Sequence, residues 1–343
     1  MDYKHAGVDI DAGNETVRRI KALARATFTP GVLSEIGSFG GLFRVDPSRY
    51  RDPVLVASAD GVGTKLKVAF LTGRHGTIGA DLVNHCVNDI LVQGADPLFF
   101  LDYLATGRLS PDVAAEIVAG IARGCRENGC ALLGGETAEM PGFYADGEYD
   151  LAGFIVGAVD RAALIDGSAI RPGDVLIGLP SSGLHTNGYS LARQIAFEVA
   201  RLAPDAVVPE LGCAIGEALL WPHRSYRPVI APLLGASWVK GMAHVTGGGI
   251  TENLPRTLPA GTAAEIERGS WTVPPLFAWL QRTGQVGSDE MFRAFNMGVG
   301  LIVACAPADA GRILDRLREA GEAHAWRIGR VVEGDRTVRY REG

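Results

Sequence analysis

The chain has 343 residues, of which 47% are hydrophobic and 21% are charged, and its formal net charge is −6. This composition predicts a folded protein with a substantial core and excludes extended disorder. The negative charge argues against a nucleic-acid-binding surface, and the lack of an apolar run of about 18 residues argues against a membrane span. The five cysteines are scattered and the polar N-terminus lacks the apolar core of a secretory signal, so we expect a cytoplasmic protein.

The N-terminal half is predicted to have the order β-α-β-α-β-β after a leading helix over 15–27. The glycine-rich segments at 1–15 and 37–43 are either mobile arms or lids that order on a ligand. Apolar, β-branched runs predict the strands, and amphipathic patterns predict the helices. The strands are expected over 54–59, 97–105, 130–133 and 151–159, and the helices over 77–94 and 111–128.

The first core strand leads into the motif Asp60-Gly61-Val62-Gly63-Thr64-Lys65. Glycines let a backbone approach a phosphate closely, a lysine adds a positive charge, and an aspartate can hold Mg²⁺. The spacing matches neither G-x-G-x-x-G nor the Walker pattern, so a tight turn without a ligand remains the alternative.

The helix predicted over 77–94 has a polar arc without lysine or arginine, which is unusual for a solvated surface. A solvated face and a ligand-binding face both remain possible interpretations of this arc. Its members are Asp81, Asn84, His85, Asn88 and Asp89.

Acidic residues are associated with three predicted strand ends, namely Asp60, Asp89 on the following helix, and Glu136 in the segment Gly134-Gly135-Glu136-Thr137. We expect these positions to converge at one edge of a sheet. Carboxylates that converge repel one another unless a cation lies between them, so the pattern predicts Mg²⁺.

Consecutive turn signals near 166–173 predict a boundary between domains 1–166 and 167–343. The second domain begins with a strand over 175–179, a small-residue loop and a helix to about residue 201, a layout that can bind an anion. The layout recurs at Thr246-Gly247-Gly248-Gly249, where a flexible turn is the alternative. His185 and His244 lie at these two strand ends, where acid–base or phosphate chemistry and a structural role are both open.

The remaining elements predicted in the second domain are ordinary α+β structure. Helices are expected over 274–283, 288–294 and 307–320, and strands over 299–304 and at the C-terminal end.

Taken together and in order, a set of motifs resembles one family over essentially the whole chain. The segments are Tyr3-Lys4-x-Ala6-Gly7-Val8-Asp9-Ile10, Ser58-x-Asp60-Gly61-Val62-Gly63-Thr64-Lys65, Cys86-Val87-Asn88-Asp89, Gly94-Ala95-x-Pro97-Leu98-Phe99-Phe100-Leu101-Asp102-Tyr103, Gly134-Gly135-Glu136-Thr137-Ala138-Glu139-Met140-Pro141-Gly142, Ser181-Ser182-Gly183-x-His185-x-Asn187-Gly188-Tyr189-Ser190, Thr246-Gly247-Gly248-Gly249 and Phe295-Asn296-x-Gly298-Val299-Gly300. With these segments the chain is similar to the phosphoribosylformylglycinamidine cyclo-ligases, the aminoimidazole ribonucleotide synthetases of de novo purine synthesis.

The resemblance implies an α+β, two-domain fold. It implies an N-terminal mixed sheet with helices, which forms a β-barrel across a homodimer, and a C-terminal α/β sandwich. It also implies a reaction in which ATP, with Mg²⁺, phosphorylates the formamide oxygen of formylglycinamidine ribonucleotide. An internal amidine nitrogen would then attack the iminophosphate and close the imidazole ring. The implied products are aminoimidazole ribonucleotide, ADP and phosphate.

Residues of this chain are assigned to the implied reaction by their place in the matching motifs. The nucleotide is expected at Asp60, Gly61, Gly63, Thr64, Lys65, Asp89, Gly134, Gly135, Glu136 and Thr137, and Mg²⁺ at Asp60, Asp89 and Glu136. The substrate's 5′-phosphate is expected at Thr246, Gly247, Gly248 and Gly249 with Asn187. His185, His244 and Lys65 are the candidate catalytic residues.

Alternative families and classes fit the sequence less well. Selenophosphate synthetase, thiamine-phosphate kinase, formylglycinamidine synthase and the hydrogenase-maturation relative share ATP-binding parts. The N-terminal segment lacks the cysteine that a selenophosphate synthetase would need, and the chain is too short for a formylglycinamidine synthase. The hydrogenase-maturation relative has a different set of acidic motifs. A Rossmann dehydrogenase would need G-x-G-x-x-G. A non-catalytic nucleotide sensor could dispense with the acidic residues at positions 60, 89 and 136, all of which are present.

Overall fold

The computed structural model describes residue 5 and residues 7–342; Tyr3, Lys4 and Ala6, which carry part of the family resemblance, lie outside the described residues. The chain forms two compact units. The first runs to Ile90 and resumes from Ala95 to Arg161, and the second consists of Leu91–Gly94 and the chain from Ala162 onward.

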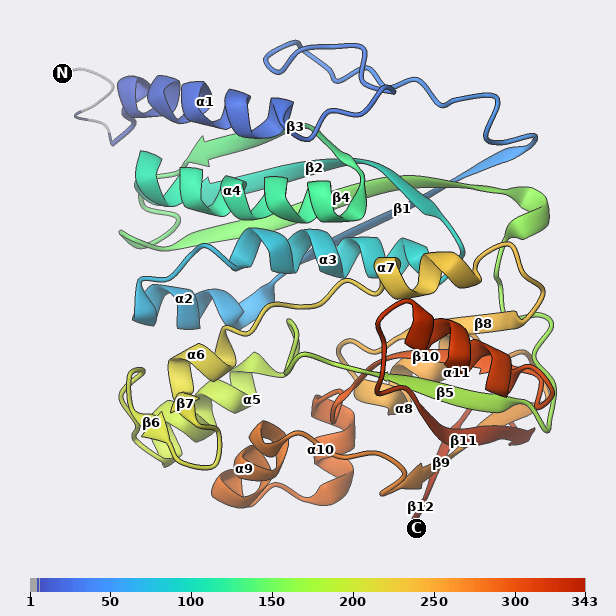
Figure 1. Ribbon diagram of the computed structural model, residues 1–343. Helices are drawn as coiled ribbons and strands as arrows, with labels where there is room; N and C mark the ends of the chain where they lie inside the picture. Colours follow the sequence, from blue (N-terminus) through green and yellow to red (C-terminus); the bar gives the residue numbers. More distant parts are fainter. Residues whose placement is uncertain (1–4, 6, 343) are drawn as a thin grey trace. The chain divides into compact units, whose positions relative to one another are not determined.

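The N-terminal unit is built on a mixed four-stranded sheet (Figure 1). The strand order is β1-β4-β2-β3, with β4 antiparallel to both of its neighbours and β2 parallel to β3. The strands are β1 (Pro53–Gly61), β2 (Asp96–Thr106), β3 (Ala131–Glu139) and β4 (Tyr149–Asp160). The helices are α1 (Ile10–Arg25), α2 (Leu66–Thr72), α3 (Ile78–Leu91) and α4 (Pro111–Asn128), and a 3₁₀ turn covers Gly63–Lys65.

One face of this sheet is covered by helices that approach unusually closely. A Cβ on Gly79 of α3 would lie 2.1 Å from the Ile117 carbonyl oxygen of α4, so only glycine allows this helix contact. Leu82 of α3 lies against Gly153 of β4, which places the apolar arc of α3 on the sheet. The apolar periodicity of α3 is thus satisfied by burial against strands and a neighbouring helix.

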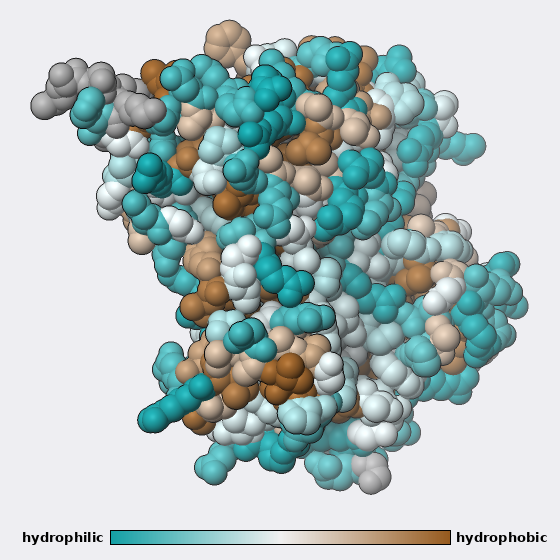
Figure 2. Space-filling model, turned by 60° about the vertical axis from the view of Figure 1, so that its left-hand side comes forward, coloured by the Kyte–Doolittle hydropathy of each residue, from teal (hydrophilic) through white to brown (hydrophobic). Residues whose placement is uncertain are grey.

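The opposite face of the same sheet carries apolar side chains that are exposed in the single chain. Side chains alternate between the two faces of a strand, so Leu55, Ala57 and Ala59 share a face with Phe154 across the β1–β4 register. All four residues are exposed. Figure 2 shows further apolar patches, in brown, among the hydrophilic surface on one side of the chain.

The C-terminal unit is built on a six-stranded sheet with the order β12-β9-β11-β5-β10-β8, in which only the β12–β9 pair is parallel. Its strands are β5 (Val175–Pro180), β8 (Val239–His244), β9 (Thr262–Arg268), β10 (Val299–Cys305), β11 (Trp326–Glu333) and β12 (Val338–Glu342). A small ribbon joins β6 (Val207–Val208) and β7 (Cys213–Ala214).

The helices of this unit are mostly short, and their core includes apolar residues of β5, β10, α7 and α11. They are α5 (Tyr189–Arg193), continued as a π-helix over Gln194–Val199, α6 (Ile215–Leu219), α7 (Arg227–Ile230), α8 (Gly249–Asn253), α9 (Pro275–Gly284), α10 (Ser288–Ala294) and α11 (Ala310–Glu319).

Both units combine helices with a sheet, so the expected α+β class is confirmed. The sequence does not predict β9, because its first five residues are all buried and therefore show no alternation of apolar and polar side chains. Among the described helices, none has both the length and the apolar character needed to cross a membrane.

Candidate active-site residues

Two of the expected carboxylates converge on one imidazole in the N-terminal unit. The Nε2 atom of His85 on α3 lies 3.0 Å from Asp60 Oδ2 and 3.8 Å from Asp89 Oδ2. Asp89 also accepts a hydrogen bond from the Ser58 hydroxyl at 3.0 Å. The side chains of Asp60 and Asp89 are 44% and 26% exposed, so both carboxylates remain accessible to a ligand.

In the group of Asp60, His85 and Asp89, Asp60 and His85 shift each other's pKa values toward the charged forms. Burial acts to raise the pKa of Asp60, but the hydrogen bond and charge of His85 outweigh it, and the net pKa lies below the usual range. Burial acts to lower the pKa of His85, but the hydrogen bond to Asp60 and the charge of Asp89 raise it above its ordinary value. The group therefore favours ionised carboxylates, which are the oxygen ligands that Mg²⁺ prefers.

Lys65 is placed differently from the expectation. Its ammonium lies 2.8 Å from Asp81 Oδ2 on α3, and both side chains are fully buried. A side chain that solvent does not reach has no exposed surface for a phosphate, so the burial of Lys65 does not support the predicted phosphate contact and catalytic role, which stay predictions. The ion pair instead ties the turn after β1 to α3, which makes Lys65 a positioning residue for the Asp60–Thr64 segment.

The polar arc of α3 is not a solvated face. Asp81, Asn84, His85 and Asn88 are buried, and Asn128 of α4 donates a hydrogen bond from Nδ2 to Asn84 Oδ1 at 2.8 Å. Buried polar groups need such partners to offset the loss of water. The arc therefore supplies internal structure through Asp81 and Asn84, and site chemistry through His85 and its neighbour Asp89.

Glu136 does not join Asp60 and Asp89 within one chain, which corrects the expected convergence of three carboxylates. The register aligns Asp60 with Gly153, Asp102 and Gly135 across the four strands. Glu136, one residue further along β3, therefore points to the opposite face, three strand spacings or roughly 14 Å from β1. The strand order separates these carboxylates because β4, the last strand of the unit in sequence, pairs between β1 and β2.

Glu136 instead lines a cavity of about 720 Å³ in the N-terminal unit. Gly134, Gly135 and Thr137 also line it, as do the glycine-rich segment 37–41 and apolar residues of α1. Glycines on two sides expose backbone groups, and apolar walls suit a flat ring, so the cavity has the chemistry of a nucleotide pocket.

Asp102 of β2 is a further carboxyl group at this cavity. Burial raises the pKa of Asp102 to about 7. A Cβ on Gly135 would lie 2.3 Å from Asp102 Oδ1, so the carboxyl group occupies space that only a glycine leaves open. Asp102 is part of the Leu101-Asp102-Tyr103 segment of the family resemblance, but its sequence context gave no reason to single it out.

Replacing Asp102 with Asn is expected to reduce the pH dependence of stability. Because the folded-state pKa of about 7 lies above the ordinary value of 3.8, folding favours the protonated acid. This stabilisation is fully present below about pH 4 and is lost as the pH rises through about 7. Asn has the same shape and does not ionise, so the variant should lose less stability than the wild type between pH 5 and pH 8. Thermal unfolding at both pH values measures this, and equal losses in the two proteins would contradict it.

In the C-terminal unit, the structure brings Asn187 beside the Thr246–Gly249 segment. A Cβ on Gly247 would lie 3.3 Å from Asn187 Oδ1. The buried Asn253 donates hydrogen bonds to the carbonyl oxygens of Gly247 and Gly249, at 2.9 and 2.8 Å. Gly248 and Gly249 have φ values of 90° and 58°, which glycine adopts without strain. The segment therefore forms a turn whose carbonyl groups are held by one asparagine.

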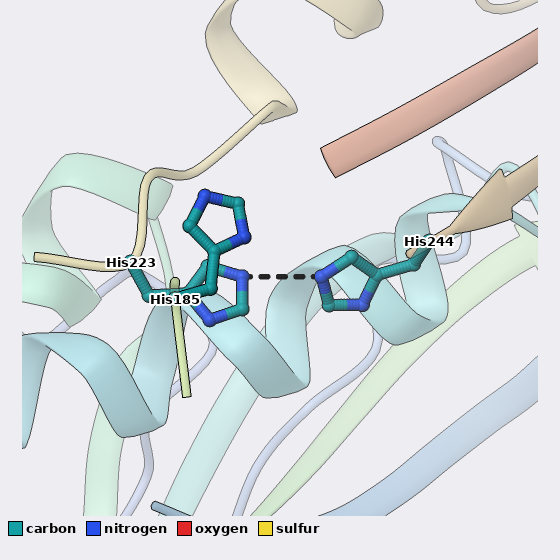
Figure 3. Close-up of side chains that lie close together, drawn as sticks. All are labelled: His185, His223 and His244. Atoms are coloured by element: carbon teal, nitrogen blue, oxygen red, sulfur yellow. Dashed lines mark hydrogen bonds between the residues drawn. The ribbon is translucent and has the colours of Figure 1, made fainter. Parts of the chain in front are cut away.

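The two expected histidines are joined by a third, His223, between α6 and α7 (Figure 3). The rings of His185 and His223 are stacked, with centroids 3.9 Å apart and planes 15° apart. His223 Nε2 lies 3.1 Å from His244 Nε2. Three buried imidazoles thus meet at the ends of β5 and β8. The sequence does not indicate His223, because it lies in a loop outside every motif.

Comparisons with known proteins identify the class to which this fold and these motifs belong. Residues 44–159 match the family "AIR synthase related protein, N-terminal domain", and residues 171–341 match "AIR synthase related protein, C-terminal domain". Among solved structures, thiamine-monophosphate kinase from Stenotrophomonas maltophilia aligns over 95% of both chains with a TM-score of 0.69 at 19% identity. The hydrogenase maturation protein HypE in complex with ATP aligns over 95% of this chain and 91% of its own, with a TM-score of 0.64 at 20% identity. These two likenesses establish the fold.

Relatives of higher identity narrow the class to one family. The phosphoribosylformylglycinamidine cyclo-ligase of Trichlorobacter lovleyi is 58% identical over 329 residues, which cover 96% of this chain and 94% of that protein. The protein of the same name from Myxococcus xanthus is 58% identical over 332 residues, covering 97% and 96%. The chain therefore belongs to the phosphoribosylformylglycinamidine cyclo-ligase family, a family of ligases.

Proposed function

We propose that the chain catalyses the ATP-dependent ring closure of formylglycinamidine ribonucleotide to 5-aminoimidazole ribonucleotide, with release of ADP and phosphate, in de novo purine synthesis. The 58% identity across nearly the full length of a cyclo-ligase carries this proposal. The free cysteines fit a reducing compartment, and we propose the cytoplasm.

The N-terminal unit supplies the nucleotide site in this proposal. Asp60 and Asp89 are suited to hold Mg²⁺, because both carboxylates are partly exposed and lie against one histidine. Mg²⁺ with ATP supplies neutralised phosphates and an activated phosphoryl group. Gly61, Gly63 and Thr64 form the turn beside these carboxylates, and Lys65 holds that turn from within the protein. The backbone and side chains of Gly134–Thr137 line the cavity that would take the remainder of the nucleotide.

The C-terminal unit supplies the substrate site. The Thr246–Gly249 turn with Asn187 offers backbone N–H groups and an amide to the 5′-phosphate. His244, two residues before this turn, would take the proton that the attacking amidine nitrogen must lose when the new C–N bond forms. Formation of an iminophosphate from the formamide oxygen would give that nitrogen an electrophilic carbon to attack.

Incubation of the purified chain with ATP, Mg²⁺ and formylglycinamidine ribonucleotide tests the function. We expect aminoimidazole ribonucleotide and ADP to appear in equal amounts. Chromatography and mass spectrometry measure both products. ATP hydrolysis without an aminoimidazole product would refute the cyclo-ligase assignment. Thiamine monophosphate as the alternative phosphate acceptor separates this activity from that of the kinase with the same fold.

We also infer that the chain acts as a homodimer whose N-terminal sheets close into a shared barrel. The exposed apolar face with Leu55 and Phe154 supports this inference, because such a face on a sheet normally packs against another layer. Closure would set the β3 edge of one chain beside the β1 edge of the other. The predicted nucleotide-binding residues on β1 and β3 are far apart within one chain. In the closed barrel they would lie at the same junction between the two chains.

A charge on this face should prevent the pairing. Phe154→Arg is expected to convert the dimer to a monomer, because the side chain is 43% exposed in the single chain and a charge would be buried in the barrel. Sedimentation velocity measures the mass, and circular dichroism checks the fold. Leu71→Arg, on α2 and 55% exposed, is the matched control and should remain dimeric. A dimer of unchanged affinity in the Phe154 variant would contradict the barrel.

A further inference from the structure

The proposed reaction gives no role to the motif Phe295-Asn296-x-Gly298-Val299-Gly300, which carries part of the family resemblance. In the structure this motif leads from α10 into β10 of the C-terminal unit. It contacts the loop after β5, which carries Asn187, and the Thr246–Gly249 turn after β8. These are the two segments for which binding of the substrate's 5′-phosphate is proposed.

Phe295 packs directly against both of these segments. A Cβ on Gly188 would overlap the Phe295 ring, and a Cβ on Gly249 would lie 2.7 Å from the Phe295 carbonyl oxygen. Gly188 and Gly249 have φ values of 77° and 58°, so both positions need glycine for their space and for their conformation. Phe295 therefore fixes the residue next to Asn187 and the last residue of the turn.

The side-chain amide of Asn296 holds the start of the loop after β5. Its Oδ1 atom accepts hydrogen bonds from the Ser181 hydroxyl at 2.9 Å and from the Gly298 N–H at 2.8 Å, and its Nδ2 atom donates to the Gly183 carbonyl oxygen at 2.9 Å. A backbone N–H can only donate and a carbonyl can only accept, so these partners fix the orientation of the amide. Asn296 is 3% exposed, and its three hydrogen bonds offset the loss of water.

The backbone of this connection is held in an uncommon conformation. Met297 has a φ of 50°, which a residue with a side chain adopts only where its surroundings impose it. The Trp271 indole N–H donates a hydrogen bond to the Met297 carbonyl oxygen at 2.9 Å. The segment that carries Asn296 is therefore a fixed support and can define the position of the loop that it contacts.

We propose that Asn296 is a positioning residue for the substrate's 5′-phosphate, because its amide holds the loop that presents Asn187 to the Thr246–Gly249 turn. This inference rests on the proposed function. Asn296 acts through the loop and not by contact with the phosphate. The alternative is that Asn296 only stabilises the fold of the C-terminal unit. The two roles predict different kinetics, because a loss of fold stability does not select one substrate over the other.

Asn296→Ala removes all three hydrogen bonds of the amide. We expect KM for formylglycinamidine ribonucleotide to rise about 10-fold or more, while kcat and KM for ATP change less than about threefold. A phosphate held equally in the ground state and the transition state contributes to KM and not to kcat. A wild-type KM for the ribonucleotide in this variant would overturn the proposal.

Two further variants control for stability and folding. Thr262→Val removes one buried hydrogen bond, from the Thr262 hydroxyl to the Pro259 carbonyl oxygen at 2.7 Å, on a strand that β11 and β5 separate from β10. This control should keep the wild-type KM, and a rise equal to that of Asn296→Ala would overturn the proposal. Ser181→Ala removes one hydrogen bond of Asn296 and should raise KM for the ribonucleotide about threefold. If Asn296→Ala does not fold, an unchanged KM in Ser181→Ala overturns the proposal.

A second measurement is independent of turnover. Binding of ribose 5-phosphate is followed by ³¹P NMR, with the nucleotide site filled by a non-hydrolysable ATP analogue and Mg²⁺. We expect the Kd to rise about 10-fold in Asn296→Ala and to stay unchanged in Thr262→Val. Equal affinity in the wild type and Asn296→Ala, or no binding to the wild type, would overturn the proposal. If the wild type forms no aminoimidazole, the proposed function fails, and this comparison still decides whether Asn296 supports a phosphate site.

Discussion

Asp60→Asn is expected to weaken the binding of Mg²⁺ with ATP by at least about 10–100-fold. Substitutions of residues that merely support a metal ligand already cost this much, and Asp60 is proposed as a direct ligand. The substitution removes one of the two carboxylates that converge on His85 and leaves the shape of the side chain nearly unchanged. It also removes the negative charge of Asp60, which helps to raise the pKa of His85, so the imidazole should lose positive charge.

Isothermal titration with Mg²⁺ and a non-hydrolysable ATP analogue measures the effect. Asp52→Asn is the matched control, because Asp52 is an exposed carboxylate of the same unit that pairs only with Arg161 in the described contacts. The control should bind the nucleotide normally. Sedimentation should show the same mass for both variants, because neither residue lies on the exposed apolar face of the sheet. Unchanged nucleotide affinity in Asp60→Asn would refute the role given to this carboxylate.

The sequence predicted the elements that carry local signals. The strand before Asp60 and the amphipathic helix α3 follow from side-chain periodicity, and the glycine-rich turns follow from composition. The pairing of Asp60 with Asp89 could be expected because the helix predicted over 77–94 follows the motif closely in the chain, with only the short helix α2 between them. These relations depend on neighbours in the chain, which sequence patterns describe well.

The positions of Glu136 and Lys65 could not be predicted in the same way. The place of Glu136 depends on the strand order and on a register in which one residue changes the face of the sheet. The position of the Lys65 ammonium depends on whether the side chain points toward solvent or toward Asp81. The same sequence motif is compatible with both directions. His223 depends on a loop that folds back on two strand ends, a tertiary contact with no local signal.

Lys65→Met is expected to destabilise the N-terminal unit by about 3–5 kcal/mol. Breaking a buried ion pair by removing one partner leaves the other charge buried without compensation. Burial acts to lower the pKa of Lys65, and the negative charge of Asp81 acts to raise it. The charged form of the buried lysine therefore depends on the neighbouring carboxylate. Urea unfolding, followed by hydrogen exchange of amides in α2 and α3, measures the loss in the unit concerned.

The stability of two further variants distinguishes an ion pair from simple packing. Lys67→Met removes a half-exposed lysine that pairs with Glu148, so it should cost less than about 1 kcal/mol. The double variant Lys65→Met, Asp81→Asn removes both buried charges and should recover part of the stability lost in Lys65→Met. If Lys65→Met and Lys67→Met unfold at the same urea concentration, Lys65 does not hold the turn. The phosphate role predicted from the motif would then be the better explanation for a lysine at this position.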